Sequence, residues 1–206
     1  MIPFIVNCQV IESASEVFLR LNIRLCYNFS MEKLFEKTLN TAAIYNGKVF
    51  NITRDDVELS NGKKTIREVV HHKGGVVIAA EKDNKILMVK QFRYPAQDVL
   101  YELPAGKLDK ANESILDAAK RELEEETGYN AKSWESLGFI WTSPGFCNEK
   151  LYLFKAADLT FIGQHLDEGE ILNYIEIEKE QVFKMIKDGI INDSKTIAAL
   201  MRAYKL

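Results

Sequence analysis

Four glutamates crowd into the segment Arg121-Glu122-Leu123-Glu124-Glu125-Glu126-Thr127-Gly128. At about 100° per residue on a helix, Glu125 and Glu126 lie beside Glu122, because residues three and four apart meet on one face. Glu124 points the opposite way. Carboxylates clustered on one face repel one another unless a cation lies among them. Their hard oxygen atoms favour Mg²⁺ or Mn²⁺, which commonly bridge to substrate phosphates. The spacing therefore predicts a divalent-metal site.

The helix that would carry these glutamates has an apolar stripe on its other side. Ile115, Ala119 and Leu123 recur at helical spacing, and Gly128 lies where a C-cap glycine would end the helix. We therefore expect a helix from about Glu113 to Gly128. The alternative is that a glutamate-rich run is only a solvated helix face, which is the commoner case for such runs. The upstream residues decide between the two.

The upstream residues complete a longer pattern: Leu103-Pro104-Ala105-Gly106, then Glu113, Arg121-Glu122-Leu123 and Glu125-Glu126-Thr127-Gly128-Tyr129. This pattern closely resembles the Nudix box, which runs Gly, five residues, Glu, seven residues, Arg-Glu-apolar, one residue, Glu-Glu, one residue, Gly-apolar. One departure is clear, since six residues (107–112) separate Gly106 from Glu113. Loops accept insertions at low cost, so we expect the loop to bulge and the helix to survive.

Further segments resemble the ADP-ribose pyrophosphatase branch of the Nudix hydrolases over roughly residues 31–206. They are Gln91-Phe92-Arg93-Tyr94, Leu100–Gly106, Ser143-Pro144-Gly145-Phe146 and Gly189–Thr196. The resemblance implies Mg²⁺-dependent hydrolysis of ADP-ribose to AMP and ribose 5-phosphate. Two alternatives stay open: a pyrophosphatase for another nucleoside-diphosphate sugar, such as ADP-glucose or GDP-mannose, and a non-catalytic nucleotide-binding regulator with the same fold.

The resemblance also implies roles for particular residues. Glu122, Glu125 and Glu126 would hold Mg²⁺, or Mn²⁺ in its place, together with the backbone carbonyl of Ala105. Arg121, with Glu113, would support these ligands by pairing with a carboxylate and fixing its rotamer. Arg93 is a candidate for a bidentate phosphate contact, and Glu102 is a candidate for substrate orientation or hydroxyl binding.

The general base has two candidates, because some Nudix enzymes use a box glutamate and the ADP-ribose branch uses one on a later loop. Glu126 is the first candidate. Glu168, in the acidic turn Asp167–Glu170, matches the second, and the glycines of this segment would let the loop close over substrate. An ordinary acidic turn is the alternative. Glu149 is expected to bind substrate, or to reach the metals through water, unless it is a strand-edge surface residue.

Other conspicuous residues are more simply explained by structure. His71 and His72 alternate across a predicted strand, so at most one of them faces a pocket, and a structural role is the simpler interpretation. Cys147 has no base placed beside it by the sequence, which argues against nucleophilic catalysis. Trp141 and Phe146 could stack on adenine, although large aromatic side chains more often serve packing.

Composition bounds the classes of function. The chain has 206 residues, with 47% hydrophobic and 28% charged side chains and a net charge of −3. That balance is typical of a globular protein with a substantial core and argues against a nucleic-acid binder. The three cysteines show no disulfide or zinc spacing, and no apolar run approaches the length of a membrane span. We expect a cytoplasmic protein with a small-molecule substrate.

The organisation of the chain is predicted in three parts. Residues 1–30 are interpreted as an N-terminal extension, the alternative being an added helix around Glu16 to Leu25. Residues 31–73 carry the hairpin signals Asn46-Gly47 and Asn61-Gly62, which predict a small antiparallel β domain. The resemblance implies that this domain is exchanged across a homodimer and contributes to the partner's substrate site. Residues 74–206 would form the Nudix hydrolase domain.

Within residues 74–206, runs of strand and helix formers alternate. Strands are expected at 76–80, 85–92, 134–142, 150–156 and 171–177, and closing helices at 179–187 and 194–204. The second closing helix has a buried stripe at i, i+3, i+4 and i+7. Mixed elements in this order predict an α/β protein, a Nudix α/β/α sandwich in which helices cover a mixed sheet.

Overall fold

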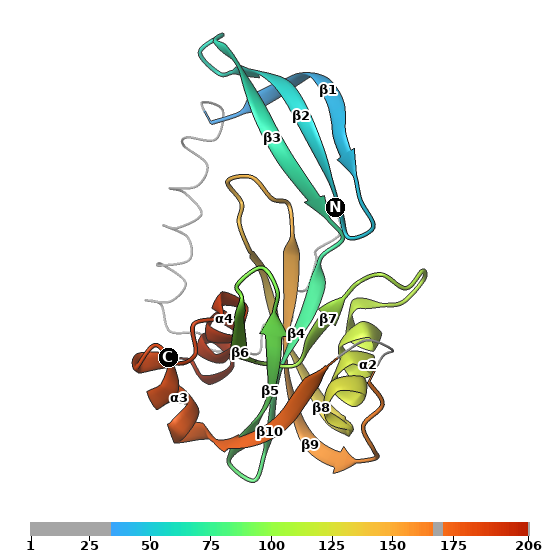
Figure 1. Cartoon of the computed structure of the whole chain (residues 1–206), viewed down its shortest axis with the longest axis vertical. Helices are drawn as coiled ribbons and strands as arrows, with labels where there is room; N and C mark the ends of the chain where they lie inside the picture. Colours follow the sequence, from blue (N-terminus) through green and yellow to red (C-terminus); the bar gives the residue numbers. More distant parts are fainter. Residues whose placement is uncertain (1–33, 167–170, 206) are drawn as a thin grey trace, which may run out of the picture. The chain divides into compact units, whose positions relative to one another are not determined.

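The structure, a computed structural model, describes residues 34–166 and 171–205 (Figure 1). The predicted extension over residues 1–30 and the candidate base Glu168 lie outside the described residues. By its internal contacts the chain divides into two compact units. One takes in the residues up to Ala42 together with Arg54–Arg67, and the other takes in Ala43–Thr53 and Glu68–Leu206.

An antiparallel sheet of three strands lies at the N-terminal side of the sequence. Its strands are β1 (Glu36–Asn46), β2 (Phe50–Leu59) and β3 (Lys64–His72), in that order across the sheet. Both predicted Asn-Gly pairs lie where its strands connect: Asn46 ends β1 and Gly47 follows it, and Asn61-Gly62 lies between β2 and β3. Gly62 has a φ of +80°, a conformation that favours glycine, and Asn61 Oδ1 accepts a hydrogen bond from Lys63 N at 3.0 Å.

The second sheet is mixed, as predicted. Its main path runs β10-β5-β4-β9-β8, with β6 paired to β5 and β7 paired to β4. The β4–β9 pair is parallel, and the other recorded pairs are antiparallel. The strand bounds are β4 Gly75–Lys82, β5 Lys85–Arg93, β6 Asp98–Glu102, β7 Ala105–Lys107, β8 Tyr129–Trp141, β9 Lys150–Phe161 and β10 Leu172–Glu178.

Strands β4 and β5 form a hairpin that opens away from its turn. The turn residues Asp83 and Asn84 both have positive φ, 50° and 63°, as a two-residue type I′ turn requires. The two strands pair only at Glu81–Lys82 with Lys85–Ile86. Beyond that point β4 pairs with β7 and β9, while β5 pairs with β6 and β10. The split leaves the start of β4 and the end of β5 apart, and the candidate site lies there.

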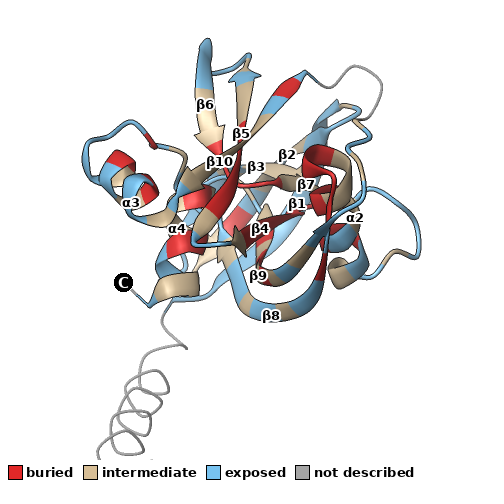
Figure 2. Ribbon diagram, turned by 90° about the horizontal axis from the view of Figure 1, so that it is seen from below, coloured by how far each residue is buried: buried red, intermediate tan, exposed pale blue. Residues whose placement is uncertain are grey.

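Helices cover both faces of this sheet, which confirms the predicted sandwich (Figure 2). Successive side chains of a strand point to opposite faces, and β4 is buried along most of its length. Val77 and Ala79 pack with helices α3 (Lys179–Lys187) and α4 (Ser194–Tyr204). Val76, Ile78 and Ala80 pack with helix α2 (Ile115–Thr127).

The two closing helices begin and end at the predicted residues, whereas several strands are longer than expected, β8 and β9 most of all. Strand β8 begins at Tyr129 rather than Trp134, because the chain enters it directly after the C-cap Gly128 and Tyr129 pairs with Phe161 of β9. That pairing also carries β9 to Phe161 rather than Ala156. No helix in residues 34–166 and 171–205 is long and apolar enough to cross a membrane.

Candidate active site

Helix α2 is defined by its two caps. Ser114 Oγ accepts a hydrogen bond from Asp117 N at 3.1 Å, so the helix begins at Ile115, two residues after the expected Glu113. Gly128 ends it in the left-handed conformation, with φ at 76°, and its N–H donates to Glu124 O at 2.8 Å. The predicted C-cap is confirmed. Because both ends of the helix are capped, the backbone that carries the glutamates is held in one position.

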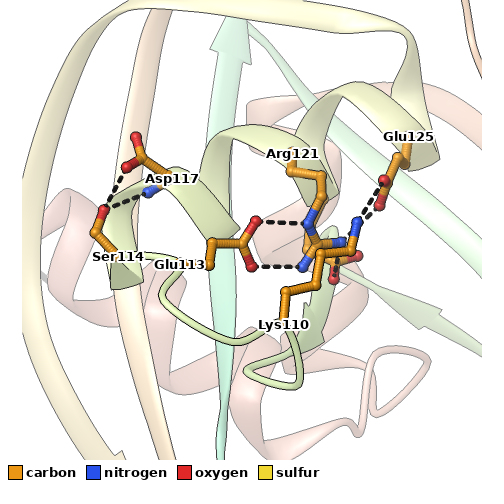
Figure 3. Close-up of polar contacts among 7 residues, drawn as sticks. Lys110, Glu113, Ser114, Asp117, Arg121 and Glu125 are labelled. Carbon is orange, nitrogen blue, oxygen red and sulfur yellow. Dashed lines mark hydrogen bonds and ion pairs between the residues drawn. The ribbon is translucent and has the colours of Figure 1, made fainter.

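The guanidinium of Arg121 gathers three carboxylates (Figure 3). Arg121 Nε donates to Glu113 Oε1 at 2.8 Å, and Nη2 donates to Glu113 Oε2 at 3.0 Å. Nη1 donates at 2.7 Å to both Glu122 Oε1 and Glu125 Oε2. The hydrogen bond from Arg121 holds the pKa of Glu113 below its usual value, and these carboxylates raise the pKa of Arg121. Charge-assisted contacts of this kind fix the rotamers of the glutamates.

The loop before α2 takes up the extra residue of the box. Asn112 adopts a φ of 63° just before Glu113, which an asparagine tolerates better than most residues. Lys110, in the same loop, lies 3.4 Å from Glu125 Oε1 through its Nζ. The helix and its glutamates are intact, so the expectation that the loop would absorb the insertion is confirmed.

The segment that leads into β7 meets the same glutamates. Ala105 N donates to Glu126 Oε2 at 2.9 Å. Gly106 lies so close to Glu122 that a Cβ at this position would overlap the carboxylate. Both Glu122 and Glu126 are buried. Ala105 and Glu126 are 21 positions apart in the sequence. The structure nevertheless brings Ala105 together with the glutamates of α2: Glu122, Glu125 and Glu126.

The donor set suits a hard divalent cation. Carboxylate oxygens and a backbone carbonyl are the groups that Mg²⁺ and Mn²⁺ take, and the missing side chain of Gly106 leaves the space that the Glu122 carboxylate occupies. Within the described ranges, no three acidic, histidine or cysteine side chains already enclose a metal position. Arg121 Nη1 donates to two of the carboxylates, those of Glu122 and Glu125.

A cavity of about 520 Å³ adjoins these residues. Part of its lining comes from α2, which contributes the carboxylates of Glu122 and Glu126 together with Arg121. Another part comes from the separated ends of β4 and β5: Gly75, Val76 and Gln91. Basic side chains also line the cavity: Arg93, Lys107, Lys110 and Lys195. A site with carboxylates for a metal beside cations for phosphate oxygens has the charges that a diphosphate substrate needs.

Arg93 and Glu102, both substrate-binding candidates, bind each other. Arg93 Nε donates to Glu102 Oε1 at 2.7 Å, and Nη2 donates to Oε2 at 2.6 Å. Lys195 Nζ donates to the same Oε2. Burial would raise the pKa of Glu102, which is 1% exposed, but the contacts with Arg93 and Lys195 outweigh it and lower that pKa. Glu102 is therefore ionised and lies beneath Arg93 and Lys195, both of which line the cavity.

Glu149 and His72 meet on another side of the cavity. His72 Nδ1 lies 3.0 Å from Glu149 Oε1 and 3.0 Å from the N–H of Gly74. His71 lies on the other side of β3, where its ring nitrogens contact Thr53 Oγ1 and Asn148 Nδ2. One histidine of the pair thus faces the cavity and the other does not, as the alternation along a strand requires.

Three other residues noted in the sequence do not line this cavity. Trp141 and Phe146 are 45% and 59% exposed, and Lys150 Nζ lies 4.7 Å above the Trp141 ring. Cys147 is partly buried, and its N–H donates to Ser143 O at 2.8 Å. Neither aromatic side chain is buried, and Trp141 packs against Phe139 with the ring centroids 6.0 Å apart.

Lys195 and Asp193 line the cavity, although no role was assigned to them from the sequence. Lys195 lies inside the segment Gly189–Thr196 that resembles the ADP-ribose branch, which was the available signal. Asp193 is the N-cap of α4, where its Oδ2 accepts from Thr196 N at 3.0 Å, and it too lines the cavity. The Nζ of Lys195 lies 3.0 Å from the same Asp193 oxygen.

Comparisons with known proteins agree with this geometry. The NUDIX domain model matches residues 70–200, and the model of the nucleoside diphosphate sugar hydrolase N-terminal domain matches residues 36–70. The ADP-ribose pyrophosphatase of Bacillus subtilis (strain 168) is 42% identical over 173 residues, covering 82% of this chain and 93% of the relative. The methanol dehydrogenase activator of Bacillus methanolicus is 44% identical over 174 residues, covering 82% and 94%.

Similarity extends to a solved structure. A crystal structure of an ADP compounds hydrolase superposes with a TM-score of 0.74 at 22% identity, covering 84% of this chain and 94% of that one. At that identity the likeness shows the fold. The domain model, the relatives and the Arg121-centred cluster of glutamates together show that this chain belongs to the Nudix family, whose hydrolases generally use a divalent metal.

Proposed function

We propose that this chain hydrolyses the pyrophosphate bond of ADP-ribose, with Mg²⁺, to give AMP and ribose 5-phosphate. The observation that carries the proposal is the single cavity in which Glu122 and Glu126 face Arg93 and Lys195. A diphosphate can approach carboxylates only with cations between them. The names of the Bacillus subtilis relative and of the similar crystal structure support an ADP-containing substrate.

The residues of the chain divide the work of the reaction. Glu122, Glu125, Glu126 and the carbonyl of Ala105 would hold Mg²⁺, which supplies charge neutralisation and a lowered pKa of the attacking water. Arg121, fixed by Glu113, keeps two of these glutamates in place. Arg93 would donate to a phosphate oxygen with the N–H groups that do not contact Glu102. Glu149 lines the cavity beside His72 and is our candidate for substrate binding.

The general base is assigned to Glu168. Its rival Glu126 is buried, and its Oε2 already accepts the N–H of Ala105. That contact suits a metal ligand held in one position better than a base that must take up a proton. Glu168 belongs to the segment that matches the base-bearing loop of the ADP-ribose branch.

The proposed assembly is a homodimer that exchanges its N-terminal β domains, and the proposed compartment is the cytoplasm. The three-stranded sheet exposes large apolar side chains, among them Leu39, Ile44, Phe50 and Ile66. Exposed apolar surface of this kind is typical of an interaction site. Light scattering on the purified chain should give the mass of a dimer, and a monomer would contradict this part of the proposal.

A substrate panel tests the activity. ADP-ribose, ADP-glucose and GDP-mannose are incubated at equal concentration with Mg²⁺ or with EDTA, and the products are separated and identified. We expect ADP-ribose to be cleaved fastest, to AMP and ribose 5-phosphate, and only with the metal. Equal or faster cleavage of GDP-mannose would reject the substrate. Failure to cleave any nucleotide sugar with metal would favour a nucleotide-binding regulator.

A further inference from the structure

Four charged side chains form a connected group, and three of them, Arg93, Asp193 and Lys195, line the same cavity as the glutamates Glu122 and Glu126. Buried Glu102 accepts from Arg93 and from Lys195, and Lys195 also lies 3.0 Å from Asp193 Oδ2. The side chains of Arg93, Lys195 and Asp193 are 38%, 15% and 13% exposed, while that of Glu102 is 1% exposed. Two cations therefore share one buried carboxylate, with a second carboxylate at the edge.

The charges of this group balance only when Lys195 is present. Arg93 and Lys195 carry two positive charges against the two negative charges of Glu102 and Asp193. Without Lys195 the group would carry a net negative charge, and Arg93 would be the one cation of the group left to neutralise Glu102. An arginine neutralised in this way attracts an anionic substrate less, since the attraction depends on the net charge close to the cavity.

The start of α4 is tied to the sheet by a contact that does not involve Lys195. The next residue, Thr196, is fully buried, and its Oγ1 accepts a hydrogen bond from Leu103 N at 2.8 Å. That bond already ties the start of α4 to the segment after β6. Lys195 extends instead to the cavity wall, where it and Arg93 are both among the lining side chains.

We infer that Lys195 is a positioning residue for an anionic substrate: it shares the charge of Glu102, so that Arg93 keeps N–H groups and positive charge for a phosphate oxygen. The inference rests on the proposed function for its substrate class, a nucleoside diphosphate linked to a sugar. Arg93 has five N–H donors, and two of them are directed at Glu102. The others are the groups that Lys195 keeps available.

Kinetics of four variants test the inference: Lys195→Gln, Lys195→Arg, Arg93→Gln and the double variant Lys195→Gln/Arg93→Gln. Each is assayed with whichever nucleotide sugar the parent hydrolyses best. We expect Lys195→Gln to raise KM roughly tenfold or more while kcat changes less than KM, and Lys195→Arg to restore most of the loss. Because Lys195 acts through Arg93, its substitution should add little in the Arg93→Gln background.

Two further variants separate positioning from a structural role. Lys184→Gln removes an exposed lysine of α3 that pairs only with Asp188 among the described residues, and it should leave KM unchanged. Thr196→Val should lower the melting temperature. Lys195→Gln with a lowered melting temperature and a parental KM would overturn the inference, as would full additivity with Arg93→Gln.

An equilibrium measurement distinguishes failure of the inference from failure of the proposed function. Binding of the nucleotide sugar that the parent hydrolyses best is followed by calorimetry in EDTA, where no turnover occurs. We expect weaker binding by Lys195→Gln, roughly tenfold, and near-parental binding by Lys195→Arg. Equal affinity of Lys195→Gln and the parent, or no binding by the parent, overturns the inference. Hydrolysis of a different nucleotide sugar would overturn only the proposed substrate.

Discussion

Gly106 and Glu122 lie so close that a single added methyl group would occupy the position of the glutamate carboxylate. The two residues come from different elements, the short strand β7 and the helix α2. Strand β7 is held against β4 by the pairing of Gly106 with Val76, so the backbone cannot easily retreat. Gly106 is therefore needed because it leaves space for the Glu122 carboxylate, whatever backbone flexibility it also provides.

Gly106→Ala should abolish most activity through this overlap. The displaced Glu122 would leave its position by about an ångström, and misplacement on that scale costs on the order of 100-fold in rate. The measurement is kcat on the best nucleotide sugar, with circular dichroism to establish that the fold persists. Gly145→Ala is the matched control, because an added Cβ there meets nothing within 4 Å. Equal rates for the two variants would contradict the role given to Gly106.

Glu122→Gln and Glu126→Gln should each reduce turnover on the order of 100-fold or more while the fold persists. Each substitution removes a negatively charged ligand but keeps the volume of the side chain. Titration with Mn²⁺, followed by its paramagnetic signal, should show weaker metal binding. Glu124→Gln, on the same helix but pointing away from the cluster, should behave as the parent. Near-normal rates in both variants would reject these residues as ligands.

Arg121→Lys should reduce metal affinity and turnover by roughly ten- to hundredfold. A lysine keeps the charge but loses the planar fork that contacts Glu113, Glu122 and Glu125 together. The measurement compares Mn²⁺ affinity and kcat with those of Lys120→Gln, which removes an exposed cation one position earlier that pairs with Asp117. If Arg121→Lys bound Mn²⁺ as the parent does, the glutamates would not need the arginine to hold them.

Local features of the metal-binding segment could be predicted because sequence spacing alone determines them. The face shared by Glu122, Glu125 and Glu126 follows from the helical repeat, and Gly128 ends the helix through its own conformational freedom. The loop insertion was tolerated for an equally local reason, since Asn112 supplies a left-handed residue. These outcomes depend on neighbours a few positions away.

The wall formed by Arg93, Glu102 and Lys195 could not be predicted because it depends on which strands are adjacent. Lys195 meets Glu102 across 93 positions of sequence, through the packing of α4 beside the sheet. The phosphate contact expected of Arg93 came from the family resemblance, and nothing in the sequence indicates that two N–H groups of its guanidinium donate to Glu102. The position of His72 in the cavity could not be predicted for the same reason, because the residue it contacts, Glu149, lies on a loop distant in the sequence.

Stability should fall in acid as Glu102 takes up a proton. Its pKa in the folded state lies below the usual value of 4.5, so its contribution is fully present above about pH 4.5 and is lost as the pH falls through the folded pKa. Glu102→Gln removes this dependence and leaves Arg93 and Lys195 without their shared carboxylate. Thermal melts at a series of pH values should show a lower melting temperature than the parent near neutrality and a smaller gap in acid. A constant gap at all pH values would contradict this linkage.

Glu168→Gln should lower kcat while leaving Mn²⁺ affinity close to that of the parent. A general base contributes roughly 10²- to 10⁴-fold to the rate, and this residue is proposed to act on water rather than on the metal. Glu170→Gln is the comparison within the same acidic turn. A loss of kcat in Glu170→Gln but not in Glu168→Gln would move the base by two positions, and a parental kcat in both would return the role to Glu126.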